Sequence, residues 1–106
     1  MSNMKKNLIE KIFQESIEVK KKCMSNNFDS IVRIGDEITK SVKKGNKIML
    51  CGNGGSAADA QHLAAEMLVR VRPNFNREGV PAITLAQDVS TITAMGNDFD
   101  YNELFE

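Results

Sequence analysis

A glycine-rich run between an apolar segment and an alanine-rich segment most constrains what this chain can fold into. Residues 52–56 read Gly-Asn-Gly-Gly-Ser, too many glycines for a regular helix or strand. The apolar run at 47–51 is typical of a buried strand, and residues 57–71 are typical of a helix. A second apolar run follows at 81–86, after a polar loop over 72–80. This order predicts a βαβ unit, and therefore an α/β fold with a parallel sheet.

Helical periodicity dominates the first 45 residues. Apolar side chains recur at helical spacing from about Met4 to Met24 and again from about Asp29 to Lys44, which predicts two helices. We expect the polar cluster at 25–27 to end the first helix and Gly45 to end the second in a left-handed conformation. Residues 1–106 would then form a single domain, with a helical region over 1–45 and an α/β core over 46–106.

The last part of the chain is short of strands. The pattern predicts a short helix or turn over 89–95, a break at 96–98 and a final segment from Tyr101 to Glu106. A parallel sheet needs more strands than two, with helices on both faces. The chain also ends within a segment of helical character without a stop signal. We therefore expect a C-terminal part to be missing, or to be supplied by another chain.

Charge and cysteine content narrow the function classes. The 14 basic and 14 acidic residues cancel, although residues 1–50 hold 11 Lys/Arg against 6 Asp/Glu and residues 51–106 hold 3 against 8. That balance argues against a generally basic nucleic-acid binder. Cys23 and Cys51 are too few for a disulfide framework. The sequence lacks an apolar run of roughly 18 residues and the apolar stretch of a signal peptide. We expect a soluble, cytoplasmic protein with no membrane or nucleic-acid partner.

The glycine loop suits an anion, because backbone N–H groups and the positive end of a helix dipole meet there. Three kinds of site use such a loop. A Walker P-loop needs Lys and Ser/Thr after the last glycine, where Ala57 and Ala58 stand. A Rossmann fingerprint is matched by Gly52, Gly54 and Ala57, but its acidic ribose partner is expected about 20 residues on. Asp88 lies 36 positions after Gly52. The third kind is a sugar-phosphate site, in which the loop binds hydroxyls or phosphate oxygens.

The helix after the loop carries a polar stripe beside its apolar one. Ser56 can cap the helix, with Asp59 completing a capping box. His62, Glu66 and Arg70 follow at i, i+4 and i+8. An imidazole and a carboxylate one turn apart can bind one zinc ion, whereas the alternative is a surface Glu66–Arg70 pair beside an uninvolved histidine. Zinc takes three or four protein ligands and His62 is the only histidine, so such a site is incomplete here. The expected buried stripe is Ala60, Leu63, Ala64, Met67 and Val71.

The run from Cys51 to His62, followed by Ala65-Glu66 and Arg70, resembles the signature of phosphoheptose isomerases. These are sedoheptulose 7-phosphate isomerases of the sugar isomerase (SIS) superfamily. The segments 81–83 and 96–99 match that family in type and order, as do the leading helices. The resemblance covers nearly all of this chain but only the N-terminal part of the family's length. It implies a flavodoxin-like three-layer sandwich and a homotetramer with active sites between subunits.

The resemblance also implies roles for individual residues. Glu66 would be the acid–base residue and, with His62, a zinc ligand. The loop residues Asn53, Gly54 and Gly55 would contact the substrate, as would Glu66, Asn97 and Asp98. The family's remaining metal ligands and its phosphate loop lie beyond position 106 and have no counterpart in this sequence.

Two functions of different classes follow from the resemblance. The first is isomerisation of sedoheptulose 7-phosphate to D-glycero-D-manno-heptose 7-phosphate, the first step towards nucleotide-activated heptose for lipopolysaccharide or capsule. The second is a non-catalytic SIS module that binds a sugar phosphate or another protein, as initiator-associating relatives do. A dinucleotide-binding fragment is a third interpretation, which saturable NAD binding would reveal.

Overall fold

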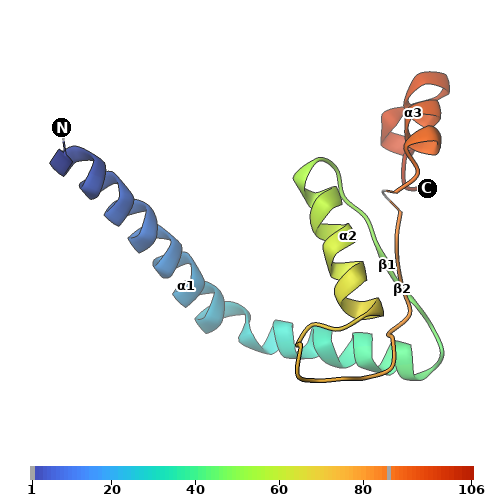
Figure 1. The fold of residues 1–106 in the computed structure, drawn as a ribbon, viewed down its shortest axis with the longest axis horizontal. Coiled ribbons are helices and arrows are strands. Elements are labelled where there is room, and N and C mark those ends of the chain that lie inside the picture. The colour runs from blue at the N-terminus through green and yellow to red at the C-terminus, as the bar shows by residue number, and fades with distance from the viewer. Residues whose placement is uncertain (1, 86) are drawn as a thin grey trace. The chain divides into compact units, whose positions relative to one another are not determined.

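Figure 1 shows the fold, a computed structural model that describes residues 2–85 and 87–106. The elements in chain order are helix α1 (Ser2–Lys43), strand β1 (Ile48–Leu50), helix α2 (Gly55–Leu68), strand β2 (Ala82–Thr84), helix α3 (Val89–Asp98) and the 3-10 helix η1 (Tyr101–Glu103). The chain divides into two compact units, Met1–Glu37 and Ile38–Glu106. The second unit contains both strands, helices α2 and α3, and η1.

The N-terminal segment forms one continuous helix, α1, and the predicted break at 25–27 is wrong. The polar side chains there bond back along the helix, since Ser25 Oγ donates to the Lys22 carbonyl at 3.1 Å and Asn27 Nδ2 donates to Cys23 Sγ at 3.9 Å. Relative to alanine, a Ser or an Asn inside a helix lowers its stability by less than about 1 kcal/mol, which is too little to interrupt a long helix. Gly45 does lie in the left-handed region, at φ 85°, as predicted for the residue after the helix.

The apolar stripe of α1 is exposed along its length. Phe13 is 66% exposed, Ile12 56% and Ile34 59%, although they recur at the spacing of a core-facing helix. The stripe comprises Leu8, Ile9, Ile12, Phe13, Ile17, Phe28, Ile31, Ile34 and Ile38. Lysine and glutamate occupy much of the opposite face, where Lys11 and Glu15 approach to 3.7 Å. An exposed apolar surface of this kind on an amphipathic helix is typical of a face that packs against other protein surface.

The predicted βαβ unit is confirmed. Strands β1 and β2 pair in parallel, with Ile48 opposite Ala82 and Leu50 opposite Thr84. The ladder extends by one bond at its end, because the Leu85 N–H donates to the Leu50 carbonyl at 2.9 Å. Helix α2 connects the two strands and packs against both (Figure 1). The strands are shorter than the runs 47–51 and 81–86 that predicted them, and Ala86 lies outside the described residues.

Small side chains line the contact between α2 and the strands. Among the described residues, Ala60 and Ala64 are the buried apolar ones, at 4% and 3% exposure, and Thr84 on β2 is 5% exposed. Their size lets the helix backbone approach the sheet closely. Of the predicted buried stripe, Ala60 and Ala64 are buried and Met67 is half-buried, but two positions are wrong. Leu63 is 47% exposed and Val71 is 61% exposed, the latter because α2 ends at Leu68.

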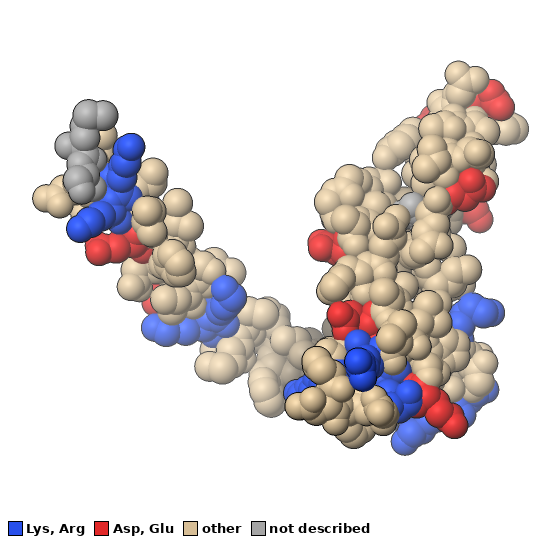
Figure 2. All heavy atoms as spheres, viewed as in Figure 1, with Lys and Arg blue, Asp and Glu red and all other residues tan. Residues whose placement is uncertain are grey.

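The C-terminal segment is helical and acidic. Helix α3 runs through 96–98, so the predicted break there is wrong, and the Phe99 N–H closes its last turn onto the Met95 carbonyl at 3.0 Å. The N-cap of η1 is Asp100, whose carboxylate accepts from the Asn102 N–H at 2.9 Å. Residues 78–106 hold no Lys or Arg, and Figure 2 shows acidic side chains on the helical segment at this end of the chain. The acidic residues are Glu78, Asp88, Asp98, Asp100, Glu103 and Glu106.

Candidate functional site

The glycine loop joins the end of β1 directly to the start of α2. At Gly54 φ is +58°, a conformation that favours glycine. At Gly52 any side chain is excluded, because a Cβ there would lie 2.6 Å from the Ser56 carbonyl carbon and oxygen. The Ser56 N–H donates to the Asn53 carbonyl at 3.1 Å, which tightens the turn. The loop therefore holds Asn53 to Gly55 at the carboxyl end of a parallel strand, where ligands of open α/β sheets bind.

The predicted capping box at Ser56 is wrong. Helix α2 begins at Gly55, and its N-cap is Gly54, which offers no side-chain cap. The Ala57 N–H donates to the Gly54 carbonyl at 3.1 Å instead, so the first turn is closed by the loop backbone. Ser56 lies inside the helix, too late along the chain to cap it. Ser56 itself is exposed beside the loop.

His62 and Glu66 meet on α2, one helical turn apart as the sequence predicted. His62 Nε2 lies 3.4 Å from Glu66 Oε1, and the imidazole side chain is 77% exposed. The Glu66 side chain is only 28% exposed. Its second oxygen, Oε2, is buried and has no hydrogen-bond partner in the described part of the chain. A buried carboxylate oxygen without a partner is costly, so it indicates a ligand at this position.

The donor set around Glu66 suits part of a zinc site. Zinc accepts imidazole nitrogen and carboxylate oxygen, and the pair brings one of each to the same point on α2. Within residues 2–85 and 87–106, no group of three or more His, Cys, Asp or Glu side chains gathers closely enough to hold a metal ion. His62 and Glu66 therefore fit a zinc ion as two ligands of a larger set.

Arg70 leaves the stripe that the sequence assigned to it. Because α2 ends at Leu68, the Arg70 guanidinium turns to the following loop, where it donates to the Pro73 carbonyl at 3.1 Å and to Asn76 Oδ1 at 3.2 Å. The predicted alternation of His62, Glu66 and Arg70 along one helix face is thus limited to its first two members. The alternative was a surface ion pair between Glu66 and Arg70. Among the described residues, the Arg70 guanidinium contacts Pro73 and Asn76 and the Glu66 carboxylate contacts His62, so this pair does not form.

Arg77 contacts the site residue Glu66 through the backbone, and the sequence reasoning missed it. Its Nη2 donates to the Glu66 carbonyl at 2.6 Å and its Nη1 to the Met67 carbonyl at 2.7 Å. Cations suit the last carbonyls of a helix. A signal was present, since Arg77 is the last basic residue in the sequence and lies in the polar loop that must return from α2 to β2.

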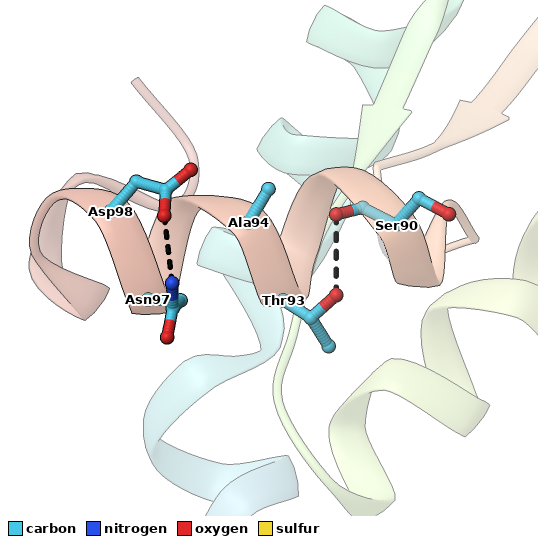
Figure 3. Close-up of a pocket in the computed structure, with 5 residues that line it drawn as sticks. All are labelled: Ser90, Thr93, Ala94, Asn97 and Asp98. Carbon is cyan, nitrogen blue, oxygen red and sulfur yellow. Dashed lines mark hydrogen bonds between the residues drawn. The ribbon is translucent and has the colours of Figure 1, made fainter.

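Asn97 and Asp98 lie at the end of α3, on an element separate from the glycine loop. They line a shallow, open pocket with Ser90, Thr93 and Ala94 (Figure 3). Asn97 Nδ2 donates to Asp98 Oδ1 at 2.7 Å, and Thr93 Oγ1 donates to the Val89 and Ser90 carbonyls at 2.7 and 3.2 Å. The pocket does not include the loop residues, His62 or Glu66. The residues expected at the site thus form two groups, one on the loop and α2 and one on α3.

Asp88 has a structural role that accounts for its position. It is the N-cap of α3, and its carboxylate accepts from the Thr91 hydroxyl and from the Ser90 N–H at 3.1 Å. These hydrogen bonds, with that of Thr91 first, hold the pKa of Asp88 below its ordinary value. A carboxylate committed to a helix cap is not the ribose ligand that a dinucleotide site needs.

The chain belongs to the SIS domain family, whose sequence pattern matches residues 12–106. Within that family it is similar to phosphoheptose isomerases. It is 45% identical to the one from Roseiflexus sp. (strain RS-1), over 87% of this chain and 46% of that protein. The one from Aquifex aeolicus (strain VF5) is 46% identical over 92% of this chain and 50% of its own length. The chain spans about half the length of the curated relatives it matches.

Solved structures agree with this assignment. The phosphoheptose isomerase GmhA from Neisseria gonorrhoeae superimposes with a TM-score of 0.82 at 34% identity, over 94% of this chain and 50% of that one. A phosphoheptose isomerase from Francisella tularensis gives a TM-score of 0.78 at 31% identity, over 93% of this chain and 49% of that one. The predicted α/β fold of SIS type is thereby confirmed. No helix among the described residues combines the length and apolar content needed to cross a membrane.

Proposed function

We propose that the protein isomerises sedoheptulose 7-phosphate to D-glycero-D-manno-heptose 7-phosphate, the first step towards nucleotide-activated heptose for lipopolysaccharide or capsule. The observation that carries the proposal is Glu66. Its carboxylate is largely buried, with Oε2 unpartnered among the described residues and Oε1 facing His62 at 3.4 Å. This arrangement follows a glycine loop in a chain similar to phosphoheptose isomerases. A largely buried carboxylate on the helix that follows a substrate loop is suited to moving a proton.

The reaction transfers one proton between neighbouring carbons. The carboxylate of Glu66 removes a proton from C1 of the ketose, and the C1–H electron pair becomes part of a C1–C2 enediolate. The proton is then returned to C2, and the proton of the C1 hydroxyl moves to the oxygen on C2. The carbonyl is now at C1, and no atom is gained or lost. We assign this proton to the carboxylate of Glu66, whose Oε1 faces His62 at 3.4 Å and whose Oε2 is buried.

We also propose a zinc ion, with His62 and Glu66 as two of its ligands and the others outside this chain segment. When bound, the ion would stabilise the negative charge that develops on the substrate's oxygens. The support is the donor set described above, one imidazole and one carboxylate on neighbouring turns of α2. The exposed imidazole of His62 is accessible to a metal from solution.

Substrate contacts are proposed for Asn53, Gly54 and Gly55 on the loop and for Asn97 and Asp98 on α3. Amide and carboxylate groups suit sugar hydroxyls, and exposed loop backbone suits hydroxyls or an anion. The phosphate needs cations or free N–H groups, and the acidic segment from 78 onwards offers no cation. The resemblance to phosphoheptose isomerases implies a phosphate loop beyond position 106, and we propose that the phosphate binds there while α3 faces the sugar.

The complete protein is proposed to be a homotetramer built on one SIS domain, with residues 1–106 as its N-terminal part. The support is the exposed apolar stripe of α1, because large apolar side chains in water favour association. We propose a cytoplasmic location, in which the free and exposed Cys23 and Cys51 would remain thiols.

The central experiment is a Glu66→Gln substitution in the complete protein, assayed with sedoheptulose 7-phosphate by NMR detection of the aldose product. Loss of a general base lowers turnover by about 10²- to 10⁴-fold, and the circular dichroism spectrum should not change. The matched control is Glu78→Gln, an exposed acidic residue of the neighbouring loop, which should retain wild-type turnover. Retained turnover in Glu66→Gln would exclude Glu66 as the base. Sugar-phosphate binding without turnover in the wild type would favour the non-catalytic SIS module.

A further inference from the structure

Arg77 fastens the loop 69–81 to the last turn of α2. The guanidinium is partly buried, and each of its two terminal nitrogens bonds a different helix carbonyl, Nη2 that of Glu66 at 2.6 Å and Nη1 that of Met67 at 2.7 Å. Nη1 also donates to the Glu78 carbonyl at 2.9 Å, within the loop itself. One planar side chain thus ties the loop and the helix end together.

Two further contacts bring the same loop onto the same turn. The Val80 N–H donates to the Met67 carbonyl at 2.9 Å, so that carbonyl accepts from both Val80 and Arg77. Gly79 approaches so closely that a Cβ on it would lie 2.8 Å from the Leu68 carbonyl oxygen. The three successive carbonyls of residues 66–68 are therefore covered by residues 77–80.

The last turn of a helix frays unless its carbonyls find partners, and here it carries the side chain on which the proposed chemistry depends. Glu66 lies in this last turn, because α2 ends at Leu68. A shift of its backbone would move its carboxylate relative to His62 and to the glycine loop at the other end of the helix. In catalysis, displacement of a reacting group by about 1 Å can cost 10²-fold in rate.

We propose that Arg77 is a positioning residue for Glu66: it sets the place of the carboxylate by holding the Glu66 and Met67 carbonyls, and it does not itself contact the substrate. The inference rests on the role of Glu66 in the proposed function. Lysine cannot substitute fully, because its single ammonium lacks the planar fork that reaches two carbonyls at once.

The test compares Arg77→Ala with Arg72→Ala in the complete protein. Arg72 is an exposed arginine of the same loop whose side chain forms no hydrogen bond or ion pair with the described residues. For each variant three kinds of measurement are made below its melting temperature: steady-state kinetics giving kcat and KM for sedoheptulose 7-phosphate, zinc affinity by competition with a chromophoric chelator, and amide hydrogen exchange at Val69 and Val80. Arg77→Lys serves as the conservative variant and as the substitute if Arg77→Ala does not fold.

We expect Arg77→Ala to lower kcat by about 10- to 100-fold with KM changed less than about twofold, and to weaken zinc binding about tenfold. Exchange at Val69 and Val80 should accelerate, Arg77→Lys should be intermediate, and Arg72→Ala should match the wild type. Added guanidinium ion, at concentrations that leave the wild-type melting temperature unchanged, should restore part of the kcat of Arg77→Ala.

The proposal is overturned if exchange at Val80 accelerates while kcat and zinc affinity stay within twofold of the wild type. Arg77 would then be a purely structural anchor. Failure of the proposed function would look different, because the wild type itself would not isomerise the sugar. In that case zinc affinity and amide exchange still decide whether Arg77 positions Glu66. Equal zinc affinity in Arg77→Ala and wild type would refute the positioning role.

Discussion

The replacement of Gly52 by alanine is the sharpest stability test that the glycine loop offers. The new Cβ would lie 2.6 Å from the carbonyl carbon and oxygen of Ser56 and 2.7 Å from its Cβ. Carbon atoms in van der Waals contact lie about 3.5 Å or more apart, so the overlap is nearly 1 Å. Two of the three atoms are backbone in the first turn of α2, and no side-chain rotation relieves the clash. We expect the substitution to lie at the upper end of overpacking costs, about 3 kcal/mol.

The assay is urea unfolding followed by circular dichroism, with the free energy of unfolding extrapolated to water. Gly35→Ala is the matched control, because its Cβ would meet no atom within 4 Å and its backbone is already helical. That variant should gain about 0.5–1 kcal/mol, since alanine favours a helix over glycine. If Gly52→Ala lost less than about 0.5 kcal/mol, the close approach of Gly52 to the first turn of α2 would be wrong.

Two further predictions concern the ends of the chain. The carboxylate of Asp88 has a lowered pKa in the folded protein, so its contribution to stability is complete above the unfolded value of about 4 and is lost as the pH falls through the lower folded value. Wild type should therefore exceed Asp88→Ala in urea midpoint at neutral pH, and the difference should shrink on acidification towards pH 3; a constant difference would argue against the charged cap. On α1, Phe13→Glu places a charge in the exposed apolar stripe and should lower the molar mass measured by light scattering, whereas Lys11→Glu on the opposite, polar face should not. An unchanged mass in Phe13→Glu would exclude that part of α1 from the assembly.

Local patterns predicted the α/β core well. The glycine run, the two apolar runs and the position of Gly45 each depend on one short segment, and the structure confirms all of them. The pairing of His62 with Glu66 was also predictable, because the i, i+4 spacing alone brings two side chains together on any helix. Spacing predicted less well where the helix itself ended. Arg70 was assigned to the same face, but α2 stops two residues earlier.

Competition between weak local signals explains the remaining errors. Ser25 and Asn27 are residues that often end helices, yet their side chains found partners one turn back and α1 continued. At Ser56 the cap was predicted from the side chain, whereas the Gly54 carbonyl already accepts the bond that closes the first turn. The contact of Arg77 with the Glu66 carbonyl spans 11 positions and depends on how a loop returns. No local pattern fixes such a path.

The two buried alanines of α2 limit which substitutions this sequence can accept during evolution. Ala60 and Ala64 set the separation between the helix and the strands, and His62 and Glu66 are carried on the same rigid element. In a library that samples every residue at positions 60 and 64, bulky side chains would lift the whole helix and carry the imidazole and carboxylate with it. Variants that retain function should therefore be restricted there to glycine, alanine and serine. Selection for activity would therefore restrict positions 60 and 64, which face the sheet, although neither side chain takes part in the chemistry. The exposed Leu63 between them should accept more substitutions.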